Sequence, residues 1–207
     1  MGDTLRERGC DRVSPDEISE MFHSGYSWHT PDITYTDRVG YTWWEDLFLH
    51  FRPYFLKSGI SDREADDIDR IFREKILDPE NYLLYEDAKE TLRLCGEKGY
   101  YNYILSNNYP ELEEVVKALG LGTYFEGYVV SAAIGYEKPR PEIFEYAKKT
   151  AEYPGLCVMI GDNPRADILG GIAANMHAIL VHSDESHFGE DFSVKELSEI
   201  PDILGKL

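Results

Sequence analysis

Cysteine is scarce in this chain. The 207 residues include three cysteines, Cys10, Cys95 and Cys157, which are scattered and form no CxxC pair. Three scattered cysteines are too few for a disulfide framework and fit a reducing compartment. We therefore expect Cys95, in a helical pattern, and Cys157, in a strand pattern, to be small core residues rather than reactive thiols.

The chain also has few basic residues and no long apolar run. Lys and Arg number 21 against 39 Asp and Glu, which gives a formal net charge of −18. This charge opposes binding to DNA, RNA or acidic membranes, although a local cluster of cations can still attract a small phosphate monoester. No run approaches the roughly 20 apolar residues that cross a bilayer, and no basic segment followed by an apolar stretch opens the chain. We expect a cytoplasmic protein without nucleic-acid or membrane partners, unless a signal precedes Met1.

The second half of the chain contains alternating strand and helix patterns. Strand patterns cover 100–105, 127–131, 156–160 and 177–182, and helix patterns cover 88–97, 110–119, 140–150 and 165–174. Such alternation is typical of right-handed βαβ units, so it predicts an α/β fold with a Rossmann-like parallel sheet flanked by helices. The length and the 43% hydrophobic content allow one compact domain plus an insertion.

The segment 14–77 has helical patterns without convincing strands. Ser14-Pro15-Asp16-Glu17 and Ser61-Asp62-Arg63-Glu64 each read as the capping box of a helix. Between them, residues 43–55 are rich in aromatic side chains, which favours a helical core over a ligand pocket. The patterns therefore divide the chain near residue 78, with a helical segment, 14–77, before that point.

The strand pattern at 156–160 leads to two carboxylates. Its apolar run ends at Gly161, which lets the chain turn, and Asp162 and Asp167 follow. Ligands of open α/β sheets gather outside the carboxyl ends of the strands, where two acids can hold Mg²⁺ against a phosphate. The alternative is that Asp162 only N-caps the helix that begins near Pro164.

Two other strand ends carry complementary groups. Ser106 and Asn107 follow the strand at 100–105, and Lys138 comes shortly after the strand at 127–131. A phosphoryl site needs neutral donors, a cation and metal-binding acids, and all three are present in sequence order. Taken singly, Ser106–Asn108 could be an ordinary polar turn and Lys138 a solvated lysine. Their joint occurrence at successive strand ends favours a phosphate site.

These groups resemble motifs II, III and IV of the haloacid dehalogenase (HAD) superfamily of phosphohydrolases. The resemblance covers about Tyr82 to His182, and Gly-Tyr-Glu-Lys-Pro-Arg-Pro-Glu-Ile-Phe at 135–144 is especially close to motif III. It implies that residues 1–13 and 78–207 form the α/β core and that the inserted segment 14–77 is a C1-type helical cap, which closes over the site and selects the leaving group. Substrate contacts are then expected in the cap, and the candidates are Tyr26, Trp28, His29, Trp43 and Trp44.

The resemblance also implies a role for each motif residue. Ser106 would hydrogen-bond the phosphate with Asn107 beside it, and Lys138 would neutralise the phosphate and the nucleophile. Asp162 would bind Mg²⁺, and Asp167 would support it directly or through another group.

The nucleophile is the part that the chain as given lacks. In the family it is the first aspartate of motif I, DxDxT or DxGxT, at the end of a first strand in the middle of the sheet. Aligning Thr4 with the threonine of the motif places Gly2 at the second aspartate position and the nucleophile one residue before Met1, so Asp3 is not a candidate. The resemblance implies that Thr4 binds phosphate and that Gly2 offers its backbone carbonyl to the metal.

A missing central strand would be costly. Burying about five apolar side chains contributes on the order of 10 kcal/mol, which rivals the total stability of a domain. We therefore expect that the gene product begins upstream with an apolar strand ending in aspartate. The alternative is that the N-terminus is simply a frayed polar tail.

The resemblance implies a Mg²⁺-dependent phosphohydrolase that acts on a small phosphorylated metabolite, a phosphate monoester, through an aspartyl-phosphate intermediate. Without the nucleophile the chain as given would be inactive. Gly2 cannot act as a general acid, so even a complete protein would be slow, favour good leaving groups or borrow an acid from the cap. Dehalogenation fits less well, because that branch works without Mg²⁺ and lacks the Gly-Asp-Asn of 161–163. The alternative function is a non-catalytic HAD-like protein that binds a phosphorylated ligand or a partner.

Overall fold

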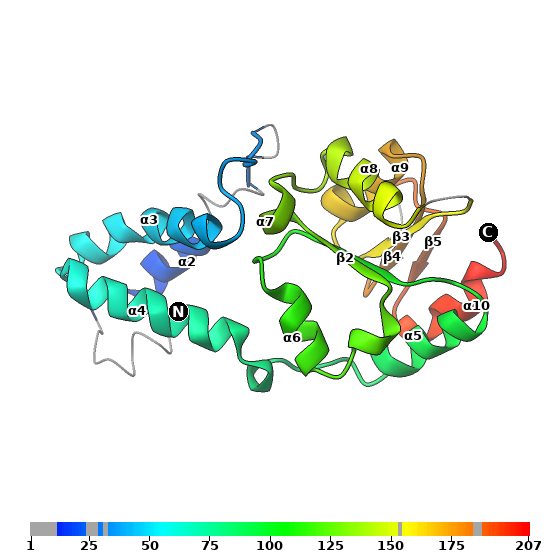
Figure 1. The fold of residues 1–207 in the computed structure, drawn as a ribbon, viewed down its shortest axis with the longest axis horizontal. Helices are drawn as coiled ribbons and strands as arrows, with labels where there is room; N and C mark the ends of the chain where they lie inside the picture. Colours follow the sequence, from blue (N-terminus) through cyan, green and yellow to red (C-terminus); the bar gives the residue numbers. More distant parts are fainter. Residues whose placement is uncertain (1–11, 24–28, 31–32, 153–154, 184–187) are drawn as a thin grey trace.

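The computed structural model describes residues 12–23, 29–30, 33–152, 155–183 and 188–207. Two groups of elements lie side by side along the long axis of the molecule (Figure 1). One consists of helices α2 (Pro15–His23), α3 (Tyr41–Lys57) and α4 (Asp62–Leu77), which we call the cap helices. The other is an α/β part that contains the strands. None of the described helices is long and apolar enough to cross a membrane.

The cap helices form where the sequence predicts them. The Ser61 side chain accepts a hydrogen bond from the Glu64 backbone N–H, and the Ser61 backbone N–H donates to the Glu64 carboxylate at 2.9 Å. Ser14 and Glu17 form the same reciprocal pair at the start of α2. These contacts confirm both predicted capping boxes.

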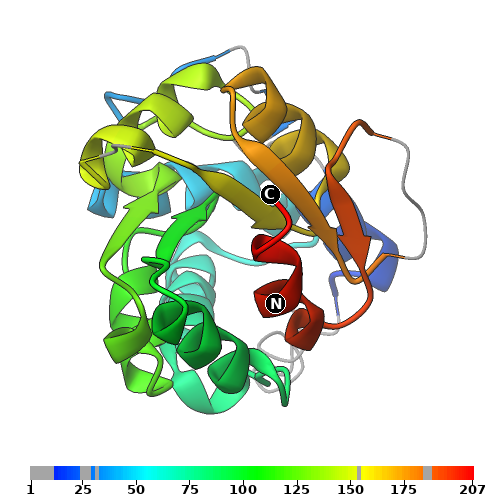
Figure 2. The same cartoon turned by 90° about the vertical axis from the view of Figure 1, so that its right-hand side faces the viewer.

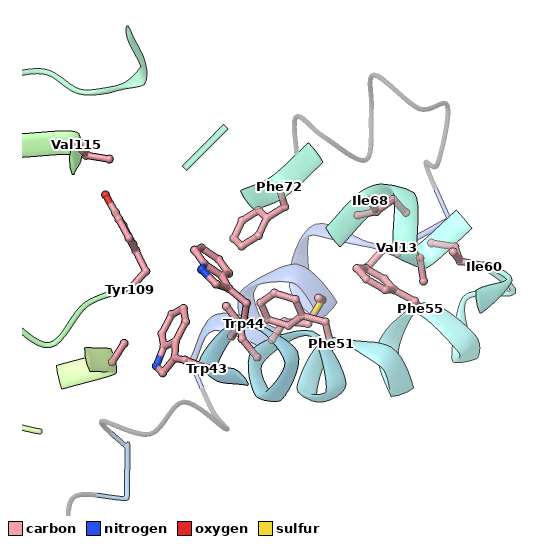
Figure 3. Packing of buried hydrophobic residues seen from close by; sticks show 14 residues of the cluster. Val13, Trp43, Trp44, Phe51, Phe55, Ile60, Ile68, Phe72, Tyr109 and Val115 are labelled. Atoms are coloured by element: carbon pink, nitrogen blue, oxygen red, sulfur yellow. The ribbon is translucent and has the colours of Figure 1, made fainter. Parts of the chain in front are cut away.

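Aromatic side chains from the cap helices fill a common core (Figure 3). Trp44, Phe51 and Phe55 are at most 1% exposed. The rings of Phe51 and Phe72 pack edge to face, with their centroids 5.8 Å apart. Ring pairs of this kind add stability beyond the burial of their area. The aromatic run is therefore a helical core, as predicted.

The α/β part confirms the predicted fold class of parallel strands flanked by helices. In chain order its elements are η2 (Pro79–Asn81), α5 (Ala88–Glu97), β1 (Tyr103–Ser106), α6 (Leu112–Ala118), η3 (Gly122–Tyr124), β2 (Gly127–Val130), α7 (Ser131–Ile134), α8 (Pro141–Thr150), β3 (Val158–Gly161), η4 (Pro164–Leu169), α9 (Gly170–Ala173), β4 (His177–Val181), β5 (Phe192–Val194), η5 (Leu197–Glu199) and α10 (Ile200–Leu204). Helices α8 and α9 lie on one side of the strands, and α5 and α10 lie on the other (Figures 1 and 2).

Some element boundaries differ from the prediction. The helix expected at 165–174 is a π-helical segment, η4, followed by the short helix α9. The short elements α7 and β5 were not predicted, because four and three residues are too few to show a hydrophobic period.

The strands form two parallel sheets rather than one. β1 pairs with β2, and β3, β4 and β5 pair in that order, but β1 and β3 do not pair with each other. A mainly apolar cavity of about 620 Å³ is lined by residues from both of these strands, including Leu105 of β1 and Val158 and Ile160 of β3. Cys95 of α5 and Ile200 of α10 also line it. Within the described part of the chain, side chains and not backbone hydrogen bonds link the two sheets.

Cys95 is a small core residue, as predicted, whereas Cys157 is only partly buried. Cys95 is 4% exposed, Cys157 is half-buried, and both thiols are free. Burial raises the pKa of both thiols, which opposes formation of the reactive thiolate. Cys10 lies outside the described residues.

One buried carboxyl group makes the cap helices sensitive to pH. Asp69 of α4 is 3% exposed, and its Oδ1 has no hydrogen-bond partner. Its Oδ2 lies 3.1 Å from the guanidinium of Arg52 in α3, which also binds the exposed Asp66. Burial outweighs the attraction to Arg52 and raises the pKa of Asp69 to about 7.

We expect Asp69→Asn to become more stable than the wild type as pH rises. The folded state retains a proton on Asp69 that the unfolded chain releases above pH 4, so wild-type stability falls between about pH 4 and pH 7. The variant lacks this cost, and its relative free energy of unfolding should improve by on the order of 3 kcal/mol over that window. Urea denaturation at several pH values measures it. Asp66→Asn is the exposed control, and an equal pH dependence in both variants would refute the assignment.

Candidate functional site

Polar side chains gather at the carboxyl ends of β1 and β3. A cavity of about 340 Å³ opens there, and it is lined by Ser106, Asn107, Lys138, Pro139, Asp162, Asn163, Arg165, Ala166 and Asp167. The structure thus brings together the groups that the sequence predicts from three separate strand ends. This is the edge where ligands of parallel α/β sheets bind.

Lys138 is the buried cation of this cavity. It is 9% exposed, and its Nζ donates to the Leu105 carbonyl at 2.8 Å and to Asp167 Oδ1 at 2.6 Å. Its backbone N–H donates to Asn107 Oδ1 at 2.7 Å, and Asn107 Nδ2 donates to the Lys138 carbonyl at 2.9 Å. A buried ammonium group requires such partners, so the alternative of a solvated lysine is wrong.

Asp167 is held on both of its carboxylate oxygens. While Oδ1 binds Lys138, Oδ2 accepts a hydrogen bond of 3.0 Å from the Asn163 backbone N–H, and the residue is 4% exposed. A Cβ at Gly161 would lie 2.2 Å from Oδ2. The glycine is therefore required because the Asp167 carboxylate lies against it, and Gly161 is not among the described glycines with a positive φ.

Asp162 is the carboxylate that remains available. It is exposed and lines the cavity, and it has no hydrogen-bond partner among the described residues. The N-cap of η4 is Asn163, whose Oδ1 accepts from the backbone N–H groups of Arg165 at 3.0 Å and Ala166 at 2.8 Å. The alternative that Asp162 is the helix cap is therefore wrong.

The loop after β1 is more than a polar turn. The Asn108 backbone N–H donates to the hydroxyl of Ser131 at 3.1 Å, and Asn107 binds Lys138 as described above. Ser131 is 2% exposed and begins α7 directly after β2. Sequence analysis missed Ser131, although a serine at the end of an apolar strand pattern was a visible signal. It also missed Arg165, for which no sequence signal existed.

Some predicted residues are not described, and others are not among the described residues that line this cavity. Gly2, Thr4, Tyr26 and Trp28 lie outside the described residues. His29 is described and exposed. Trp43 and Trp44 are buried in the aromatic core at 9% and 1% exposure, so they do not present the surface for substrate contact that was expected of them.

The carboxylates fit a magnesium ion better than a fully protein-bound metal. No group of three or more His, Cys, Asp or Glu residues with metal-binding geometry occurs within the described residues. Mg²⁺ binds through one or two carboxylates and takes its other ligands from water and substrate phosphate. Asp162 meets that need at the cavity, with Asp167 nearby but engaged with Lys138.

Comparisons with known proteins agree with this architecture. A family model described as haloacid dehalogenase-like hydrolase matches residues 17–175. Haloacid dehalogenase-like hydrolase domain-containing protein 3 of Mus musculus is 32% identical over 146 residues, which cover 69% of this chain and 57% of that protein. Glyceraldehyde 3-phosphate phosphatase of Methanothermobacter thermautotrophicus is 33% identical over 132 residues, which cover 58% of each protein. The chain therefore spans less than two thirds of the length of these relatives.

A solved structure shows the same fold. The putative HAD-hydrolase YfnB of Bacillus subtilis, crystallised with magnesium, superimposes with a TM-score of 0.74 at 18% sequence identity. The match covers 98% of this chain and 87% of that one. At this level of identity the likeness concerns the fold alone.

We expect Asp167→Ala to destabilise the protein strongly. The change leaves the Lys138 ammonium buried without its carboxylate, and breaking a buried pair in this way costs about 3–5 kcal/mol. The free energy of unfolding from urea denaturation measures the loss. Glu74→Ala, which removes an exposed 2.9 Å pair with Arg70, should change it by less than about 1 kcal/mol. Similar losses in both variants would contradict the role assigned to the buried pair.

Proposed function

Because the chain belongs to the haloacid dehalogenase-like hydrolase family, we propose that it is a Mg²⁺-dependent phosphohydrolase that acts on a small phosphate monoester. The observation that carries the proposal is the cavity where Ser106, Lys138 and Asp162 converge. It combines a neutral donor, a cation and an available carboxylate, which are the groups that phosphoryl transfer needs. The relative named glyceraldehyde 3-phosphate phosphatase supports a phosphate ester as substrate.

Each residue of the cavity has a defined part in this proposal. The Ser106 hydroxyl and the Asn107 amide hold phosphate oxygens, and Lys138 balances their charge. Asp162 would hold Mg²⁺, and Asp167, which lines the same cavity, would support it. The ion, when bound, supplies charge neutralisation for the phosphate. Lys138 is fixed by Asp167 before any ligand arrives, so its charge needs no reorganisation.

Neither aspartate of the cavity is available as the nucleophile that attacks phosphorus. Among the described cavity residues, Asp167 is engaged on both oxygens and Asp162 is assigned to the metal. We infer that a parallel apolar strand ending in aspartate occupies the cavity between β1 and β3. Both neighbouring strands are parallel to their partners, both are four residues long, and the cavity lining is mainly apolar, all of which supports such a strand. Its carboxyl end would lie beside Ser106 and Gly161, where the family's nucleophile is expected.

In this proposal the aspartate attacks phosphorus, the bond to the leaving oxygen breaks, and water later hydrolyses the aspartyl-phosphate. Since glycine stands at the second aspartate position of motif I, the leaving oxygen must take its proton from another group or leave as a stable anion. Substrates with good leaving groups are therefore favoured. A phosphate-binding protein without catalysis remains the alternative, and the same assay separates the two.

We expect an extended version of the protein, with five apolar residues and an aspartate placed before Met1, to hydrolyse p-nitrophenyl phosphate with Mg²⁺. Replacing that aspartate with alanine should abolish turnover, because it is the proposed nucleophile. In the extended protein Asp162→Ala should abolish turnover, and Ser106→Ala should lower kcat by about 10²–10³-fold because a preorganised donor is lost.

Asp202→Ala is the control, because this carboxylate is 89% exposed and far along the chain in α10. It should leave kcat unchanged. An extended, folded protein without turnover, or an Asp162→Ala variant with full turnover, would refute the proposed function. Binding of inorganic phosphate without turnover would favour the non-catalytic alternative.

A further inference from the structure

The loop between β1 and α6 lines the cavity at one end and contacts the cap helices at the other. Ser106 and Asn107 line the cavity, and Glu111 ends the loop as the N-cap residue of α6. Glutamate is not among the residues preferred at an N-cap, and the Glu111 side chain makes no capping hydrogen bond. A local rule that is broken without local gain points to a role elsewhere.

The Glu111 carboxylate binds both long cap helices. Its Oε2 accepts a hydrogen bond of 2.9 Å from the indole Nε1 of Trp44 in α3, and its Oε1 accepts one from the guanidinium of Arg73 in α4. The guanidinium also lies over the rings of Trp44 and Tyr41, at 5.5 and 5.7 Å from their centres. The Glu111 side chain is 25% exposed, so these charge-assisted bonds are better shielded than those of a surface pair.

The neighbouring Tyr109 strengthens the same contact (Figure 3). Its ring stacks on Trp44 with centroids 5.9 Å apart, and its hydroxyl lies 2.6 Å from the hydroxyl of Tyr82. Burial, together with the bond to Tyr82, raises the pKa of the Tyr109 phenol well above its usual value, so it remains a neutral hydrogen-bonding group. Two residues of the loop are thus fixed by elements outside the cavity.

We propose that Glu111 is a positioning residue, through which the docked cap helices hold the loop of Ser106 and Asn107 in place at the cavity. With Glu111 truncated, the loop keeps its core-side contacts, Asn107 to Lys138 and Asn108 to Ser131, and the stacking of Tyr109 on Trp44. It loses the charge-assisted hydrogen bonds to α3 and α4. The donors of the cavity are then less well preorganised. The effect on phosphate binding rests on the proposed function, whereas the positioning itself does not.

The direct test is hydrogen exchange of the loop in the full chain. In Glu111→Ala, the backbone amides of 106–109 and of residue 111 should exchange about tenfold faster, because a charge-assisted hydrogen bond has been removed. Glu111→Gln should restore part of the protection, since its amide oxygen still accepts from Trp44. Glu113→Ala is the matched control on the same helix, because it removes an exposed 2.5 Å pair with Lys117 and touches no cap helix.

The second readout is the affinity for inorganic phosphate with Mg²⁺, measured by calorimetry below the melting transition. We expect the Kd of Glu111→Ala to rise about five- to tenfold and that of Glu113→Ala to stay at the wild-type value. A lower melting temperature with unchanged loop exchange and unchanged phosphate affinity would show a merely structural residue and overturn the proposal.

A variant that does not fold, or a wild type that binds no phosphate, still leaves the role of Glu111 testable. If Glu111→Ala does not fold, Arg73→Met breaks the same contact from the cap side and should give the same increase in loop exchange. If the wild type itself binds no phosphate, the proposed function fails, and loop exchange alone decides the role of Glu111.

Discussion

The buried pair of Lys138 and Asp167 is the interaction on which the candidate site depends. It joins the segment after β2 to the segment after β3, and Asn107 adds the loop after β1 by bonding both the N–H and the carbonyl of Lys138. A buried ammonium group without a carboxylate is too costly to retain, so each partner requires the other. The glycine at 161 belongs to this arrangement, because any side chain there would displace Asp167. Charge, packing and backbone position are thus fixed together.

The same loops are fixed from the cap side. Gly40 N–H donates to the Ala132 carbonyl at 2.8 Å, and Tyr35 N–H donates to the Gly135 carbonyl at 2.9 Å, so the segment before α3 lies on α7. A side chain at Gly135, whose φ is +78°, would collide with the backbone of Thr36. Together with Glu111, these contacts connect the cap helices and the segment before α3 to two of the three segments that follow the strands at the cavity, those after β1 and β2. A displacement of the cap helices would therefore shift the loops at the cavity where phosphate is expected to bind.

Sequence patterns predicted the parallel fold, the helical segment before it and the residues that meet at the cavity, because strand periodicity and strand-end polarity are local properties. They failed where the outcome depends on contacts distant in sequence. Asp162 and Asn163 are equally good helix caps by sequence, and only the hydrogen bonds that the Arg165 and Ala166 N–H groups donate to Asn163 Oδ1 show that Asn163 is used. Glu111 carries no local signal, since its partners Trp44 and Arg73 lie 67 and 38 residues away.

The divided sheet links stability to the proposed chemistry. Within the described residues β1 and β3 each pair on one side only, and an apolar cavity separates them. Unpaired backbone groups beside such a cavity are costly, because neither water nor protein satisfies them fully. A parallel strand would satisfy both edges and fill the cavity, and its carboxyl end would lie at the site of Lys138 and Asp162. If one strand completes the core and also delivers the nucleophile, the same segment contributes to stability and to catalysis, so weakening its packing should reduce both.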